Sequence, residues 1–337
     1  MRLARWSDRV DATVREGFVI DGRLVEFPEG RTVADVVRSG LDEARRLHDR
    51  VNGAGESGVP LDSVRLLPPI VPAAIRDFVA FEEHVEGVTA SVDRQGGVAP
   101  EWYEAPTFYF TNPHTVRATG EIVCIPQTER LDFELELAVV IGGVEGSSGR
   151  DLTVAEANAH LFGYTVMNDW SARDLQAREM KVRLGPAKGK DFGTTLGPWI
   201  VTADEVAPYE DDGFLALHAE VWVNGRLVGE DLVSNMAWTF AELVSYAARN
   251  SIVVPGDVLG SGTVGNGGCL GELWGRGSRI APLQPGDEVR MRVEAIGEIV
   301  NIVGERVAGA PIPRARSRSR ARARTERPSQ RTPGMEE

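Results

Sequence analysis

Residues 131–142, LDFELELAVVIG, form an almost entirely apolar run that carries two glutamates, Glu134 and Glu136. Alternate residues of a β-strand point to opposite faces. Beyond Glu136 both faces of this run are apolar, which predicts a buried strand. The two carboxylates would then lie roughly 7 Å apart on one face, and burying them requires Arg or Lys partners, raised pKa values or a bound cation. The alternative is an edge strand whose first turn is exposed to water.

A second apolar stretch, FGYTVMNDWSARD (162–174), also ends in acids. Its alternation breaks at Trp170-Ser171, so Asp169 is expected at a strand end, where it can reach a site beside the sheet. We expect Arg173 and Asp174 to be structural, for instance as a buried ion pair, and Asp169 to be functional.

The segment RDFVAFEEHVEGV (76–88) combines an acid with an imidazole. Asp77 and His84 are seven residues apart, which is about two helical turns, so the pattern predicts that both lie on one face of a helix. Such a pair could be a metal ligand and a base, although a lone helical histidine is more often a surface or core residue.

The rest of the pattern predicts a β-rich core with few helices, that is, a mainly β (α+β) fold. We expect residues 1–70 to form a small N-terminal α+β module with strands in 17–27 and a helix in 33–51. A larger domain is expected over 71–310. Within it, Asn224-Gly225 indicates a hairpin, and Thr153 with Glu156 indicates a capping box at a helix start.

Composition narrows the class of protein. The chain has 337 residues, 42% of them hydrophobic, and a net charge of −13. The segment 314–337 carries a balance of +5, so the rest of the chain carries −18. A body this acidic disfavours nucleic-acid binding, and hard divalent cations suit it better. No apolar run is long enough to span a bilayer and the N-terminus has no apolar signal core, so no membrane association is expected.

The cysteines and the tail add two expectations. With only two cysteines, Cys124 and Cys269, we expect no disulfide framework and a reducing, cytoplasmic location. Residues 311–337 are Arg-rich and lack an apolar pattern, so they are predicted to be disordered. Their alternating arginines could contact anionic polymers or membranes, but a solvated tail without function is the favoured interpretation.

The segments above, with their neighbours and in this order, resemble the fumarylacetoacetate hydrolase family, and its fumarylacetoacetase branch in particular. The resemblance covers roughly residues 60–305. It implies a mixed β-sandwich roll, a homodimer, and a divalent cation, Mg²⁺, Mn²⁺ or Ca²⁺, held by acidic residues. The blocks that carry it are DFVAFEEH (77–84), LDFELELAVVIG (131–142), FGYTVMNDWSARDLQ (162–176), GKDFGTTLGPW (189–199), PGDVLGSGTVG (255–265) and CLGEL (269–273).

Carried over by position, the resemblance implies that Glu134, Glu136 and Asp169 are metal ligands. Asp77 matches a fourth acid of the fumarylacetoacetase branch. The two glutamates would then share a strand face because both point at one ion, and carboxylates form the hard-oxygen site that Mg²⁺ or Ca²⁺ accepts.

The resemblance also implies that His84 activates water and that the carboxylate of Glu272 orients His84. An imidazole of near-neutral pKa can accept a proton from water, and a neighbouring carboxylate fixes its tautomer. Other family members use a His-x-x-Glu pair, but Gly87 occupies that glutamate position here and leaves Glu86 as the alternative.

Further positions match residues around the reacting group. Lys190 matches a lysine near the metal and the reacting oxygen, with an exposed loop lysine as the alternative. Gln176 matches a residue that polarises the attacked carbonyl, and Thr263 matches a substrate contact among glycines that let the backbone approach closely. Thr194 lies near the family's metal region.

Val79 and Met180 stand where fumarylacetoacetase has tyrosines that hold the substrate's carboxylate. An apolar or less charged acyl group therefore fits better than fumarylacetoacetate. The expected activity is hydrolysis of a C–C bond in an acylpyruvate-like 2,4-dioxo acid, a small-molecule β-diketone, by His84-activated water and an enolate held on the metal. Alternatives are a decarboxylase, hydratase or isomerase of 2-oxo acids on the same site, and a non-catalytic metal-binding protein.

Overall fold

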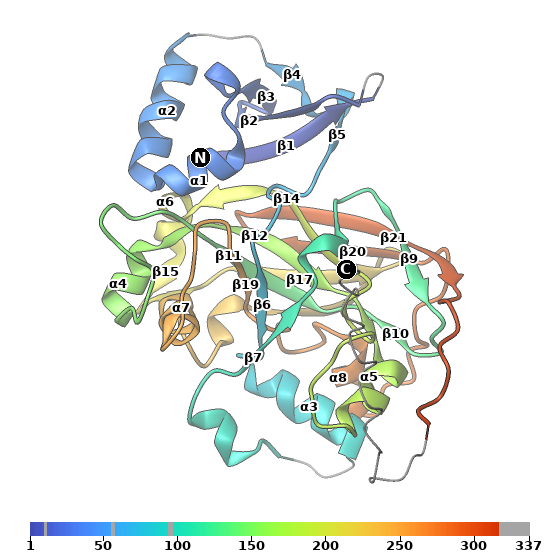
Figure 1. Ribbon diagram of the computed structural model, residues 1–337. Coiled ribbons are helices and arrows are strands. Elements are labelled where there is room, and N and C mark those ends of the chain that lie inside the picture. The colour runs from blue at the N-terminus through green and yellow to red at the C-terminus, as the bar shows by residue number, and fades with distance from the viewer. Residues whose placement is uncertain (10–11, 55–57, 94–96, 317–337) are drawn as a thin grey trace, which may run out of the picture.

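The computed structural model describes residues 1–9, 12–54, 58–93 and 97–316 (Figure 1). Its largest sheet contains β1 Arg2–Asp8, β2 Val14–Ile20, β3 Arg23–Glu26, β4 Val59–Pro60, β5 Val64–Leu66, β6 Ile75–Phe78, β7 Phe108–Thr111, β8 Val116–Arg117, β11 Leu135–Ile141, β12 Leu161–Asp169, β14 Thr194–Thr202 and β19 Val258–Gly260. The strand order is β4-β3-β2-β1-β14-β12-β11-β19-β6-β7, with β5 paired to β1 and β8 paired to β14.

A second sheet has the order β18-β17-β20-β21-β9. Its strands are β9 Ile122–Pro126, β17 His218–Val223, β18 Arg226–Leu232, β20 Glu288–Val293 and β21 Gly297–Val307. Two small pairs join β10 Leu131–Asp132 to β13 Ser171–Ala172, and β15 Glu210–Asp211 to β16 Phe214–Leu215. The helices are α1 Val33–Ser39, α2 Leu41–Ala54, α3 Glu82–Asp93, α4 Val154–Ala159, α5 Arg173–Met180, α6 Ala203–Val206, α7 Phe240–Ala248 and α8 Leu270–Gly275.

Strand β11 is buried along its whole length, as its apolar pattern predicted. One of its faces, which includes Leu137 and Val139, packs in the main core against the second sheet, where Val221 and Met291 lie. Its other face, which includes Val140, packs in a core shared with the N-terminal residues. The expected mainly β (α+β) fold is therefore confirmed, with β11 at its centre.

The N-terminal strands continue the large sheet, because β1 pairs antiparallel with β14 (Figure 1, blue). Whether residues 1–70 and 71–310 are separate domains stays a prediction. The predicted helix over 33–51 is present as α1 and α2, which break at Gly40 with a φ of 86°. The hairpin at Asn224-Gly225 and the capping box of Thr153 with Glu156 are both confirmed.

The expected helix that would place Asp77 and His84 on one face is wrong. Ile75–Phe78 is strand β6, parallel to β19, and helix α3 begins only at Glu82. A short apolar run has too few residues for its period to distinguish a buried strand from a helix. The four residues of β6 are all buried, so their side chains on both faces contact protein.

Two further predictions concern the surface and the tail. Within the described residues, no helix is long and apolar enough to cross a membrane. Residues 311–316 are exposed and form neither helix nor strand. The prediction of disorder over 311–337 falls mostly on residues 317–337, which lie outside the described residues.

Candidate active site

Strand register brings four buried carboxyl groups to one end of the large sheet. Gly260 of β19 pairs with Asp77 of β6 and with Ala138 of β11, two residues from Glu136. Asp169 is the last residue of β12, the strand that flanks β11 on the other side. Glu134 lies between β10 and β11 rather than within a strand, and its amide donates to Asn168 Oδ1 at 3.0 Å. Acids that are far apart in the sequence therefore lie close together, because the neighbouring strands β6, β19, β11 and β12 end at the same edge of the sheet.

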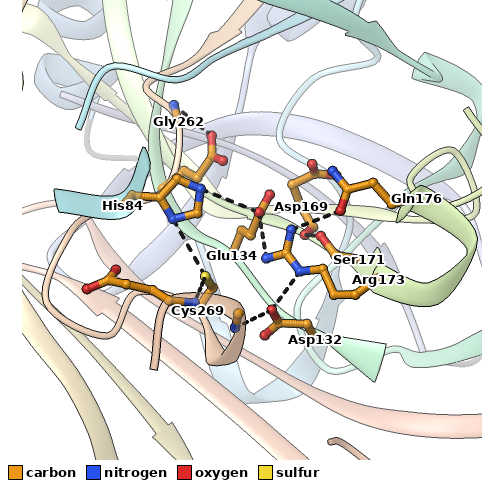
Figure 2. A network of polar contacts seen from close by, with 12 residues as sticks. His84, Asp132, Glu134, Asp169, Ser171, Arg173, Gln176, Gly262 and Cys269 are labelled. Carbon is orange, nitrogen blue, oxygen red and sulfur yellow. Dashed lines mark hydrogen bonds and ion pairs between the residues drawn. The ribbon is translucent and has the colours of Figure 1, made fainter. Parts of the chain in front are cut away.

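Two buried cations neutralise Glu134. Lys190 donates from Nζ to Glu134 Oε2 and also to Asp169 Oδ2, the latter at 2.7 Å. On the other side, Arg173 Nη2 lies 2.7 Å from Glu134 Oε1, and Arg173 Nε donates to Asp132 Oδ2 at 2.8 Å (Figure 2). Burial would raise the pKa of Glu134, but the charges of Arg173 and Lys190 hold it well below its usual range.

The remaining acids repel one another. Burial and the neighbouring carboxylate of Asp169 raise the pKa of Asp77 well above its usual range. Burial and Asp77 do the same for Glu136, and burial raises the pKa of Asp169 despite its contact with Lys190. The single positive charge of Lys190 therefore does not neutralise the three carboxyl groups of Asp77, Glu136 and Asp169.

The residues present fit a divalent cation. One oxygen each from Asp77, Glu134 and Asp169 lie within 4.8 Å of one another. Asp77 Oδ1 and Asp169 Oδ1 are buried without a hydrogen-bond partner in the described part of the chain, and each such atom is costly unless something binds it. Carboxylate oxygens are the ligands of Mg²⁺, Ca²⁺ and Mn²⁺.

Glu136 lies beside this group, where its Oε2 accepts from the amide of Gly262 at 3.1 Å. A Cβ on Gly260 would lie 2.5 Å from Glu136 Oε2 and 2.9 Å from Asp77 Oδ1. The glycine thus leaves room for both carboxyl groups at the sheet end.

His84 enters the site from α3 with its ring between two partners (Figure 2). Its Nδ1 lies 3.6 Å from Cys269 Sγ and its Nε2 lies 3.9 Å from Glu134 Oε1. Burial lowers the pKa of His84 to about 4, although Glu134 opposes this. The imidazole is therefore neutral near pH 7 and can accept a proton there.

Within the part of the chain that the structure describes, no hydrogen bond or ion pair joins Glu272 to His84. Among the described residues, Glu272 Oε1 accepts from the amide of Gly267 at 3.1 Å and pairs with Arg276 at 2.9 Å. Its side chain packs against Gly87, one helical turn beyond His84, where a Cβ would lie 2.5 Å from Glu272 Cγ. Gly87 thus makes room for Glu272, whose pKa burial raises to about 7.

The expected substrate residues lie at different distances from this centre. Gln176 Oε1 accepts from Arg173 Nη1 at 3.1 Å, so it belongs to the network (Figure 2). Thr263 is buried next to Gly262, and Val79 is half-buried directly after β6. Met180, the last residue of α5, is 48% exposed, and no contact described for it joins it to the carboxyl groups.

Thr194, which the resemblance puts near the family's metal region, pairs with Asp169 across β12 and β14 and is buried.

Arg173, which was expected to be structural, forms a buried ion pair with Asp132 and also pairs with Glu134 in the candidate site. It binds Glu134 directly, whereas Asp174 turns away to accept from Thr128 and the amide of Glu129. The start of α5 explains the difference, because consecutive helical residues project about 100° apart and cannot share partners. The pair Asp132–Arg173 also fixes α8, since Asp132 accepts from the amides of Leu270 and Gly271.

Two other site residues carried no recognisable sequence signal. Tyr109 of β7 lies opposite Asp77 and donates its hydroxyl to Asp169 Oδ2. Cys269 caps α8, accepting from the amide of Glu272 at 3.3 Å, and contacts His84. An aromatic residue in a strand and a helix-capping cysteine are common in cores, so their presence here depends on tertiary contacts.

Comparison with known proteins finds a matching family model and related sequences. Residues 73–304 match the model of the fumarylacetoacetate (FAA) hydrolase C-terminal domain. The chain is 28% identical over 309 residues to fumarylacetoacetase of Oryza sativa subsp. japonica, covering 76% of this chain and 71% of the rice protein. It is also 28% identical to oxaloacetate tautomerase YisK of Bacillus subtilis, covering 85% of this chain and 87% of that protein.

A solved structure agrees with the fold. Maleylpyruvate hydrolase from Sphingobium sp. SYK-6, in complex with manganese (II) ion and pyruvate, superposes with a TM-score of 0.66 at 22% identity, covering 91% of this chain and all of that one. Since the family model spans more than half of the chain, the chain belongs to the fumarylacetoacetate hydrolase family.

Proposed function

We propose that this protein is a divalent-metal-dependent hydrolase that cleaves a C–C bond in an acylpyruvate-type 2,4-dioxo acid. The observation that carries the proposal is the position of His84, whose Nε2 lies 3.9 Å from a carboxylate of the buried acidic cluster. A general base must be able to accept a proton at the working pH and must lie close to the reacting group. His84 lies at the edge of the proposed cation site, and its imidazole is unprotonated near neutral pH.

The acidic cluster is the proposed cation site, with Asp77, Glu134, Glu136 and Asp169 as ligands. A bound Mg²⁺, Mn²⁺ or Ca²⁺ would polarise the substrate's carbonyl oxygens and offset the negative charge that develops on them. Raised pKa values of Asp77 and Glu136 imply that these groups release protons when a cation is bound.

In the proposed reaction His84 Nε2 removes a proton from water, and the resulting hydroxide adds to the distal carbonyl carbon. The carbon–carbon bond then breaks, and its electron pair stays with the pyruvate-like fragment. That fragment takes up a proton, His84 returns to its neutral form, and the other product is a carboxylic acid.

Buried cations beside the base would stabilise the oxyanion of the addition step. Arg173 lies on the His84 side of Glu134, and Lys190 lies on the Asp169 side. Gln176 is held to Arg173 and would donate its amide N–H to the substrate. Val79, half-buried directly after β6 where fumarylacetoacetase has a tyrosine, favours an apolar acyl group at the distal end.

A second candidate function is the tautomerisation of a 2-oxo acid, or another reaction of 2-oxo acids that does not involve hydrolysis. The absence of a contact between Glu272 and His84 among the described residues favours it, since a base without its orienting carboxylate activates water less well. The similarity to a relative named as an oxaloacetate tautomerase, which covers 85% of this chain, adds support.

Homodimerisation and a reducing cytoplasmic location, in which Cys124 and Cys269 stay thiols, belong to the proposal as well.

The test is a screen of 2,4-dioxo acids and 2-oxo acids with metal-replete protein, with the products identified by mass spectrometry. The proposal expects a carboxylic acid and a pyruvate-like ketone from at least one 2,4-dioxo acid, with the activity lost in EDTA and restored by Mn²⁺ or Mg²⁺. Turnover of oxaloacetate alone, with every 2,4-dioxo acid unchanged, would favour the second candidate. No metal-dependent turnover at all would leave a metal-binding protein without catalytic activity.

A further inference from the structure

The carboxylate of Glu134 faces two different surroundings. Its Oε2 contacts Lys190, which also binds Asp169, so this oxygen belongs to the oxygen-lined cluster. Its Oε1 faces His84 at 3.9 Å and Arg173 at 2.7 Å. On this second side the neighbouring atoms that can bind a metal ion are the ring nitrogens of His84 and the sulfur of Cys269, which lies against the same imidazole (Figure 2).

His84, Glu134 and Cys269 together can ligate one metal ion on this second side. One ligand atom each from His84, Glu134 and Cys269 lie within 4.8 Å of one another, and all three side chains are buried. With the bond lengths usual for zinc, tetrahedral geometry puts a sulfur and a nitrogen ligand about 3.6 Å apart. The separation of Cys269 Sγ and His84 Nδ1 is 3.6 Å.

We propose that His84, Cys269 and Glu134 form a second cation site, selective for thiophilic ions such as Zn²⁺ or Cd²⁺, directly beside the oxygen-lined site. Thiolate and imidazole select such ions, whereas carboxylates alone suit Mg²⁺, Mn²⁺ and Ca²⁺. Glu134 is shared by both sites. An ion on the second site takes His84, so it inhibits any reaction in which His84 is the base, and this inhibition rests on the proposed function.

The thiol must lose its proton for the ion to bind. Binding converts the Cys269 thiol to a thiolate and releases its proton to solvent. Burial raises the pKa of this thiol well above its usual range, and the charges of Asp132 and Glu134 raise it further, while Arg173 lowers it. The positive charge of the bound ion therefore has to stabilise the thiolate.

Cadmium binding to protein already saturated with Mg²⁺ tests the site without reference to activity. Both cysteines are kept reduced with a phosphine, and Cd²⁺ is followed by its thiolate charge-transfer absorption in the ultraviolet. We expect one equivalent of Cd²⁺ to bind wild type with this absorption. The exposed Cys124→Ser is the matched control and should behave as wild type, whereas Cys269→Ser should lose the absorption. Undiminished absorption in Cys269→Ser, or its loss in Cys124→Ser, would overturn the proposal.

Wild type alone gives a second test that does not depend on how Cys269→Ser folds. The X-ray absorption spectrum of protein holding one equivalent of Zn²⁺ should show a sulfur neighbour at about 2.3 Å and lighter neighbours at about 2.0–2.1 Å. A shell of nitrogen and oxygen only would contradict the site.

Activity then separates this inference from the proposed function. The Zn²⁺ concentration for half-inhibition, measured relative to each variant's own uninhibited rate, should rise at least tenfold in Cys269→Ser and stay unchanged in Cys124→Ser. Sulfur-bound Zn²⁺ without inhibition would uphold the site and contradict the role of His84 as the base.

Discussion

At the scale of single residues, the site depends on which buried carboxyl groups have cationic partners. Glu134 stays ionised because Arg173 and Lys190 lie on its two oxygens. Asp77 and Glu136 form no ion pair with a cation among the described residues, and their pKa values are raised by burial and by neighbouring carboxylates, chiefly Asp169 for Asp77 and Asp77 for Glu136. A buried charge without a partner is unstable unless it takes up a proton or binds a cation.

Replacing Glu136 by Gln separates metal binding from folding. A glutamine resembles the protonated carboxyl, so the free energy of unfolding without divalent cations should change by less than about 1 kcal/mol. The cation loses a charged ligand, and we expect Mn²⁺ affinity from titration calorimetry to fall at least tenfold together with turnover. The exposed Glu145→Gln is the control, and wild-type metal content in Glu136→Gln by elemental analysis would remove Glu136 from the site.

Glu272 is expected to make stability depend on pH. Its pKa is raised from 4.5 to about 7 in the folded protein, so the folded state binds the proton more tightly than the unfolded state does. The stabilisation is fully present below pH 4.5 and is lost as the pH rises through 7.

The loss amounts to up to about 3 kcal/mol, at 1.36 kcal/mol per pKa unit. Glu272→Gln should remove this part of the pH dependence, as measured by urea unfolding of both proteins from pH 4.5 to 8 without divalent cations. Parallel curves for wild type and variant would show that Glu272 does not titrate in this range.

The sequence identified the acids of the site more easily than their partners. Glu134, Glu136 and Asp169 could be predicted because charges interrupt apolar alternation, a pattern visible along a single strand. Tyr109 and Cys269 could not, because each is an ordinary residue for its element and meets the site only across the fold.

At the scale of elements, β19 shows why the sheet end can hold so many carboxyl groups. The strand ends in Gly260, which pairs with Asp77 on one side and Ala138 on the other. A methyl group there would lie 2.4 Å from Met167 Cε and 2.5 Å from Glu136 Oε2. These separations are too short for any real Cβ contact, so the ends of the Met167, Glu136 and Asp77 side chains would have to shift.

Gly260→Ala should therefore weaken Mn²⁺ binding and lower the free energy of unfolding by about 1–3 kcal/mol, as overpacked cores do. Gly53→Ala is the control, because a Cβ on Gly53 of α2 meets nothing within 4 Å. Titration calorimetry and urea unfolding measure the two effects. Unchanged Mn²⁺ affinity in Gly260→Ala would mean that the cation does not bind at this end of the sheet.

Element prediction succeeded where local signals were strong. The hairpin at Asn224-Gly225 and the cap at Thr153 follow from turn and capping chemistry that acts within a few residues. Residues 75–84 were mistaken for one helix because the strand character of β6 comes from its pairing with β19 and β7, which lie far away in the sequence.

At the scale of the whole molecule, charge is divided between an acidic body and a basic tail. The body without residues 314–337 carries −18 and the tail carries +5. The described site lies between residues 77 and 276, and its contacts among the described residues come from the body. The fold class followed from the sequence, but the continuity of the N-terminal strands with the large sheet did not, since only two residue pairs join β1 to β14.

Truncation after Pro313 should leave the catalytic rate and the thermal midpoint nearly unchanged, because it removes a segment without apolar pattern. Steady-state kinetics and thermal unfolding of the truncated and full chains test this at the same ionic strength. A large loss of either would show that the tail docks on the acidic body, and high salt should then mimic the truncation.

The measurement that tests the central claim most directly is the fate of the water oxygen. Metal-replete wild type is given a 2,4-dioxo acid that it consumes, in water enriched in ¹⁸O, and the products are weighed by mass spectrometry. The account predicts one ¹⁸O in the new carboxylic acid, with the rate reduced roughly 10²–10⁴-fold in His84→Ala while Mn²⁺ still binds. An unlabelled product with an intact carbon skeleton, or a His84→Ala rate within about tenfold of wild type, would contradict hydrolysis by His84-activated water.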